Sequence, residues 1–129
     1  MAERLIQAWH SHDAQRVAAL FAEDYLSDQP AHPGRGFTGN EQVLTNWTGV
    51  FDGVPDFSAE LLASSVAGDT EGAEWTWTGR HPDGSAFAMR GVTILVIRDG
   101  LIAEGRPYME SFAMCAVEQR RRDTYASVE

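Results

Sequence analysis

The chain has 129 residues, of which 43% are hydrophobic, and this is the size of one domain with its own apolar core. Its 19 acidic and 10 basic side chains give a formal net charge of -9, which disfavours nucleic acid as a partner. Because the chain has a single cysteine, no secretion signal and no apolar segment long enough to cross a bilayer, we expect one soluble, cytoplasmic domain over residues 1–129 with no membrane partner.

The first half of the chain has the periodicity of helices. Residues 2–10 and 40–53 repeat apolar side chains at helical spacing, and Asp13 is a typical N-cap for a second helix between them. The segment Asp24–Phe37 ends the helices with a short extended piece around Tyr25-Leu26. A loop is then predicted from Pro30, Pro33, Gly34 and Gly36.

The second half of the chain has the alternation typical of strands. Strands are predicted at Phe57–Val66, Ala73–His81, Phe87–Arg98 and Leu101–Glu110, with turns at 68–69, 82–84 and 99–100. A last helix is predicted from Ser111 towards Arg122. This order predicts an α+β fold, in which N-terminal helices pack on a strongly curved, mostly antiparallel sheet.

The predicted strand segment Val92–Ile97 is apolar on both of its alternating faces. One face can pack against the helices, so the other face needs a different cover. We expect that cover to be a second copy of the chain, which makes the protein a homodimer through the sheet.

The last predicted strand carries the side chains best suited to chemistry. Glu104, Arg106, Tyr108 and Glu110 recur at alternate positions, so they would share one face of the sheet. In an apolar cavity the pKa of Glu110 would rise towards neutrality, which suits proton transfer, and Tyr108 could donate to a carbonyl oxygen. Pro107 is typical of an edge or a bulge, and a bulge would re-aim these side chains by one position.

Each of these polar side chains has a structural alternative. Glu110 could be a solvated acid or an ion-pair partner of Arg106, and Tyr108 could be a core tyrosine. Arg106 could anchor an anionic group of a ligand, or it could pair with Glu74 or Glu104.

The order of the elements and several short motifs resemble the SnoaL-like polyketide cyclases of the nuclear-transport-factor-2-like superfamily. The motifs are Ala8-Trp9, His12-Asp13, the segment 21–25, Gly39, the segment 99–104 and Tyr108-Met109-Glu110. The resemblance implies a cystatin-like cone with Glu110 as the acid or base on a carbonyl compound. Related epoxide hydrolases carry an Arg-x-Asp pair where this chain has Trp75-Thr76-Trp77, so the hydrolase reaction is disfavoured.

Two further titratable side chains lie in the predicted loop. The resemblance implies that Asp28 and His32 lie at the mouth of the cone, where either could be a second acid or base. The alternatives are that Asp28 forms a turn and that His32 is an exposed loop residue.

Aromatic and apolar side chains would give the cavity its shape, although core packing is an alternative for each of them. Together with Arg106, the side chains that we expect to bind the substrate are Tyr25, Trp47, Phe51, Trp75, Trp77 and Met89.

The function that follows is a cofactor-independent cyclase or isomerase, of the lyase or isomerase class, which transfers protons on a hydrophobic, polyketide-like carbonyl compound. No metal is expected, because the usual ligand spacings are missing from the sequence. The alternative function is a non-catalytic protein that binds a small hydrophobic ligand. Convergence of Glu110 with Asp28 or His32 inside the cavity would favour catalysis, and a lone Glu110 paired with Arg106 would favour binding.

Overall fold

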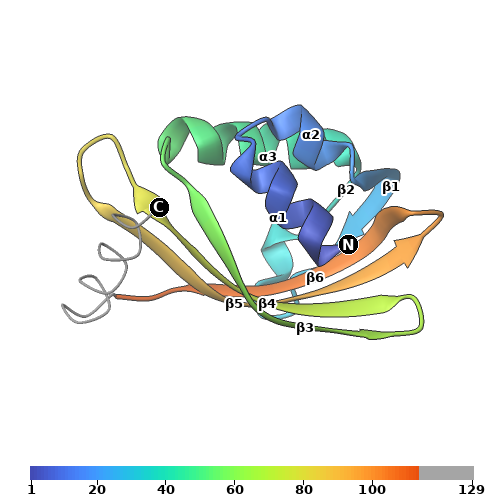
Figure 1. Cartoon of the computed structure of the whole chain (residues 1–129). Coiled ribbons are helices and arrows are strands. Elements are labelled where there is room, and N and C mark those ends of the chain that lie inside the picture. The colour runs from blue at the N-terminus through green and yellow to red at the C-terminus, as the bar shows by residue number, and fades with distance from the viewer. Residues whose placement is uncertain (114–129) are drawn as a thin grey trace.

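The computed structural model describes residues 1–113, and in these the helices lie together on one face of a single sheet (Figure 1). The predicted helix from Ser111 towards Arg122 lies outside the described residues, apart from its first positions, where Ser111 is the last residue of a strand. The elements are α1 (Ala2–His10), α2 (Ala14–Ala18), β1 (Phe21–Ser27), the 3-10 helix η1 (Pro33–Arg35), β2 (Phe37–Thr38), α3 (Asn40–Gly53), β3 (Ser58–Ala67), β4 (Thr70–Arg80), β5 (Ala86–Arg98) and β6 (Leu101–Ser111).

The six strands form one sheet in the order β2-β1-β6-β5-β4-β3. All neighbours are antiparallel except β1 and β6, which are parallel. The predicted α+β class is therefore confirmed, and the four predicted strands of the second half correspond to β3 to β6. The sheet is less strongly curled than expected (Figure 1). The pairing of β4 with β5 runs from Thr70 to Arg80 without a register shift.

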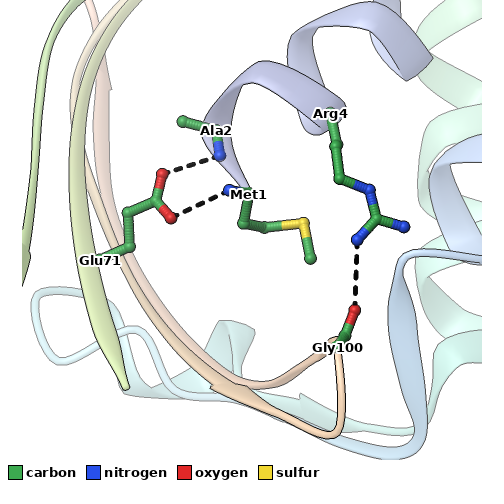
Figure 2. Close-up of polar contacts among 5 residues, drawn as sticks. All are labelled: Met1, Ala2, Arg4, Glu71 and Gly100. Atoms are coloured by element: carbon green, nitrogen blue, oxygen red, sulfur yellow. Dashed lines mark hydrogen bonds and ion pairs between the residues drawn. The ribbon is translucent and has the colours of Figure 1, made fainter. Parts of the chain in front are cut away.

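A buried carboxylate holds the start of α1 against the sheet. Glu71 of β4 accepts a hydrogen bond of 2.7 Å from the backbone N–H of Ala2 and forms an ion pair of 3.1 Å with the amino group of Met1 (Figure 2). Arg4 donates to the carbonyl oxygen of Gly100 at 3.4 Å, in the turn between β5 and β6. A carboxylate at a helix N-terminus is favoured by the free N–H groups and by the helix dipole.

The core lies between the helices and the sheet. Its most deeply buried side chains come from both layers, with Leu5 and Val17 from the helices and Trp75 and Ile102 from the strands. The indole N–H of Trp75 donates to Thr93 Oγ1 at 2.9 Å, so this fully buried polar group is satisfied.

A β-bulge early in β6 decides which side chains face the helices. The β5–β6 pairing passes from Ile97↔Ile102 to Val96↔Glu104, so Ala103 is an extra residue on β6. Ile102 lies in the core. Simple alternation from Ile102 would place the later even-numbered residues on the same face. The inserted residue moves them to the opposite face of the sheet.

In the part of the chain that the structure describes, no helix combines the length and the apolar character that a membrane crossing needs.

Candidate functional site

A cavity of about 330 Å³ lies between the helices and the sheet. Residues from α1, β1, the loop after β1, α3 and strands β4 to β6 line it. Its wall is predominantly apolar, and seven aromatic side chains contribute to it: Trp9, Phe21, Tyr25, Phe37, Trp47, Trp77 and Phe87.

The aromatic rings of the wall pack against one another edge to face. The ring centroids of Trp9 and Trp77 are 5.3 Å apart with an interplanar angle of 80°, and those of Trp47 and Trp77 are 5.5 Å apart at 81°. Tyr25 makes a similar contact with Phe21 at 4.8 Å and 78°. Edge-to-face contacts fix the relative orientation of the rings, so the wall has a defined shape.

The polar side chains that line the cavity are few. Besides the Tyr25 hydroxyl they are Ser27, Gln29, Arg35, Asn46 and Thr93. Among the described residues that line the cavity there is no aspartate, glutamate or histidine, and Arg35 is the charged one. Arg35 can only donate hydrogen bonds, whereas the other polar groups can both donate and accept them.

Tyr25 is a buried phenol at the edge of this cavity. Burial raises its pKa above the usual 10.0, and a side-chain hydrogen bond with Ser27 acts in the opposite direction to a smaller extent. The residue faced by the Tyr25 hydroxyl is Gly105, where an added Cβ would collide with the hydroxyl oxygen. Gly105 thus makes room for a neutral phenol that can donate a hydrogen bond.

The predicted orientation of β6 is wrong. The β6 residues that line the cavity are Gly105, Pro107 and Met109, whereas Tyr108 and Glu110 are on the opposite face. The cause is the bulge at Ala103, since it inverts the alternation that starts at Ile102. The bulge that was considered at Pro107 is absent from the β5–β6 pairing, in which Pro107 is directly opposite Thr93.

The structure brings Glu110 together with His32, but outside the cavity. His32 Nε2 lies 2.6 Å from Glu110 Oε1, and the two side chains are 38% and 61% exposed. Asp28 is exposed at the start of the same loop, where its backbone N–H donates to Gly105 at 2.9 Å, and its side chain does not line the cavity.

The other pairing alternatives are also decided by the geometry. Glu104 pairs with Arg98 at 3.4 Å rather than with Arg106, and the side chain that contacts Glu110 is His32 rather than Arg106. Arg106 is half-buried on the outer face of the sheet opposite Ile94, so it does not reach the cavity.

The predicted wall residues divide into two groups. Tyr25, Trp47, Trp77 and Met89 line the cavity as expected. Trp75 is fully buried behind it, and Phe51 stacks on His12 with centroids 5.2 Å apart, on a separate shallow groove.

Sequence reasoning missed several lining residues. Met109 and Gly105 carry no polar signal, and they become visible only when the bulge is known. Arg35 lies in a loop, where no periodicity reveals the direction of a side chain. Trp9 does have a detectable signal, because it lies on the apolar face of α1, but the periodicity of residues 2–10 predicts only a helix and not a cavity wall.

No group of three or more histidine, cysteine, aspartate or glutamate side chains that could hold a metal ion occurs within residues 1–113. Cys115 lies outside the described residues. The absence of a metal or cofactor requirement therefore stays a prediction.

Comparison with known proteins gives a family and a fold. The family model described as SnoaL-like domain matches residues 2–105. A search of curated proteins gave no match. Among solved structures, a protein with a ketosteroid isomerase-like fold from Catenulispora acidiphila DSM 44928, in complex with trimethylamine, is 21% identical with a TM-score of 0.72, and the match covers 83% of this chain and 82% of that one.

Two further solved structures carry functional descriptions. A candidate SnoaL-like polyketide cyclase from Jannaschia sp. CCS1 is 21% identical with a TM-score of 0.70, over 84% of this chain and 82% of that one. AclR from Streptomyces galilaeus, described as a candidate hydroxylase, is 17% identical with a TM-score of 0.73, over 84% of this chain and 85% of that one. At these identities the likeness establishes a shared fold, on which different activities occur.

Proposed function

This chain belongs to the family of SnoaL-like domains, and we propose that its function is to bind a flat, hydrophobic small molecule with a carbonyl-type oxygen in the cavity between helices and sheet. The observation that carries the proposal is the aromatic lining of a cavity of about 330 Å³ that lacks a carboxylate or imidazole among the described residues. Cavities of this size, with few polar groups, are typical ligand sites.

The aromatic wall favours a flat ligand. Trp47 and Trp77 are mutually perpendicular and both line the cavity, so a planar ring can lie against the face of one and the edge of the other. The apolar residues Met89 and Met109 complete this part of the wall, and methionine side chains adapt readily to aromatic surfaces.

The polar lining favours a ligand with an oxygen acceptor. The Tyr25 phenol is protonated at neutral pH, as any tyrosine is, and burial raises its pKa further, so the hydroxyl is able to donate to a carbonyl. Gln29 and Asn46 supply further amide N–H donors. A buried carbonyl needs such a donor, because leaving it unpaired costs about 1–3 kcal/mol.

Proton transfer on the bound molecule, as in a cyclase or isomerase, is the second candidate function. It is favoured by the contact between His32 and Glu110, because an imidazole that a carboxylate orients is a common general base. The loop of His32 also supplies Gln29 and Arg35 to the cavity. Binding is the better-supported function, since Glu110, Tyr108 and Asp28 lie outside the cavity. Epoxide hydrolysis is disfavoured, because the described residues of the lining include no carboxylic acid.

The relatives support a small-molecule site without identifying the ligand. One structural neighbour was solved with trimethylamine, and another is described as a candidate polyketide cyclase. Trimethylamine and a polyketide differ in charge and size, so the chemistry of the ligand must be inferred from the cavity lining of this chain.

The outer face of the sheet supports a homodimer. Val92 and Tyr108 are cross-strand partners on this face and are 36% and 38% exposed, beside the half-buried Ile94. The described helices lie together on one face of the sheet (Figure 1), and the cavity between helices and sheet is lined by neither Val92 nor Tyr108. A second copy of the chain would bury this apolar patch.

The proposed binding is tested by calorimetric titration with methyl 2-naphthoate, a neutral, flat carbonyl compound. Wild-type protein is expected to bind it, and Met89→Trp is expected to lose binding because the larger ring fills the cavity. Leu62→Trp is the matched control, since Leu62 is an exposed residue of β3 outside the cavity. Equal affinity in wild type and Met89→Trp would reject the cavity as the binding site.

A further inference from the structure

We propose that the ligand is an acid, and that Arg35 selects it by pairing with its carboxylate at the edge of the cavity. This inference rests on the proposed binding function and adds the charge of the ligand to it. The apolar body of the molecule would occupy the aromatic part of the cavity, and the acid group would lie beside η1.

The first argument is the charge of the lining. Arg35, the last residue of η1, lines the cavity, and among the described lining residues it is the charged side chain. The described residues give Arg35 no carboxylate partner, whereas His32, three positions earlier in the loop, is engaged by Glu110. A cation beside an apolar surface is favoured when an anion neutralises it.

The second argument is the kind of donor that lines the cavity together with Arg35. Gln29 from the same loop and Asn46 from α3 also line the cavity, and both carry amide N–H groups. A guanidinium presents a planar fork of donors that matches the two oxygens of a carboxylate. The lining therefore offers amide donors in addition to this fork, and such a set of donors suits the two oxygens of a carboxylate better than a single carbonyl.

The third argument concerns the negative charge of the whole chain, which opposes the binding of an acid. The chain has a formal net charge of -9, which repels an acidic ligand at long range. An acid is therefore selected only if a local cation compensates for this repulsion. Arg35 is placed to do so, and its exposed position makes the pairing sensitive to salt.

The test compares 2-naphthoic acid with its methyl ester, which has the same ring system but no charge. The affinity of wild type for the acid is expected to exceed that for the ester by about tenfold or more, as for a hydrogen-bonded ion pair. In Arg35→Gln the ratio of the two affinities is expected to fall to about one, while the ester still binds. Arg16→Gln is the control, because it changes the net charge equally at an exposed position of α2 away from the cavity.

The outcomes separate the two proposals. If the ester binds and Arg35→Gln keeps the same preference for the acid, or if naphthylmethylamine binds more tightly than the acid, the role of Arg35 is rejected and the binding function stands. If neither the acid nor the ester binds wild type, the binding function is rejected together with this inference.

Discussion

The contact between His32 and Glu110 joins the loop after β1 to the end of β6, with 2.6 Å between Nε2 and Oε1. The same loop supplies Gln29 and Arg35 to the cavity, and β6 supplies Met109, the neighbour of Glu110. The pair is therefore adjacent to the ligand site although neither side chain lines it. The pair can therefore have one of two roles, which experiments can distinguish. It either holds the loop after β1 against β6, or it transfers a proton to or from the ligand.

Glu110→Gln is expected to preserve the fold and the affinity for methyl 2-naphthoate. Because both partners are substantially exposed, the free energy of unfolding should fall by no more than about 1 kcal/mol. Thermal unfolding and calorimetric titration measure the two quantities. If the protein turns over a carbonyl compound and the variant loses about 10² to 10⁴ in rate, proton transfer through this pair replaces binding as the function.

Gly105→Ala is expected to displace Tyr25, since the added methyl group would collide with the phenol hydroxyl. Overpacking of this kind lowers the free energy of unfolding by about 1–3 kcal/mol. Gly72→Ala in β4 is the control, because a Cβ there meets nothing within 4 Å. Adding Tyr25→Phe should restore much of the loss, as it removes the hydroxyl. Equal stability of the two alanine variants would contradict the contact.

The stability of the protein is expected to fall at alkaline pH partly through Tyr25. Its pKa is raised in the folded state by burial, so the folded protein disfavours the phenolate. The associated stabilisation is complete below the usual pKa of 10.0 and is lost as the pH rises through the folded value. Chemical unfolding as a function of pH measures this effect. Tyr25→Phe should flatten the alkaline decrease, and an unchanged slope would exclude Tyr25 as its source.

The protein is expected to sediment as a dimer at micromolar concentration. A stable interface buries on the order of 800 Å² per partner. Val92→Asp should yield a folded monomer, because it places a charge beside the apolar side chains of Tyr108 and Ile94 on the outer face. Gln15→Glu adds the same charge on α2, on the helical side, and should leave the dimer intact. Sedimentation of wild type as a monomer would refute dimerisation through this face.

The fold was predictable because its signals are local. The periodicity of residues 2–10 and 40–53 defines α1 and α3, and glycine with aspartate marks the turns between the later strands. The parallel pairing of β1 with β6 was not predicted, since nothing in a short segment such as Phe21–Ser27 encodes a partner that is distant in the sequence.

The candidate site was predicted less well, because its orientation depends on one inserted residue. Alternation along β6 correctly groups Arg106, Tyr108 and Glu110 on one face, but the extra residue Ala103 turns that face away from the helices. The choice between a regular ladder and a bulge depends on pairing with β5, which the β6 sequence alone does not specify. Aromatic residues such as Trp47 and Trp77 were predicted correctly because apolar side chains favour either the core or the cavity wall.

The most direct test of the central claim is a crystal structure of the protein with methyl 2-naphthoate. The account predicts that the ring system lies inside the cavity, with its atoms within about 4.5 Å of Trp47 and Trp77. Its carbonyl oxygen should accept a hydrogen bond from a side chain of the lining such as Tyr25. A ligand bound instead on the outer face of the sheet beside Val92, with the cavity unchanged, would contradict the account.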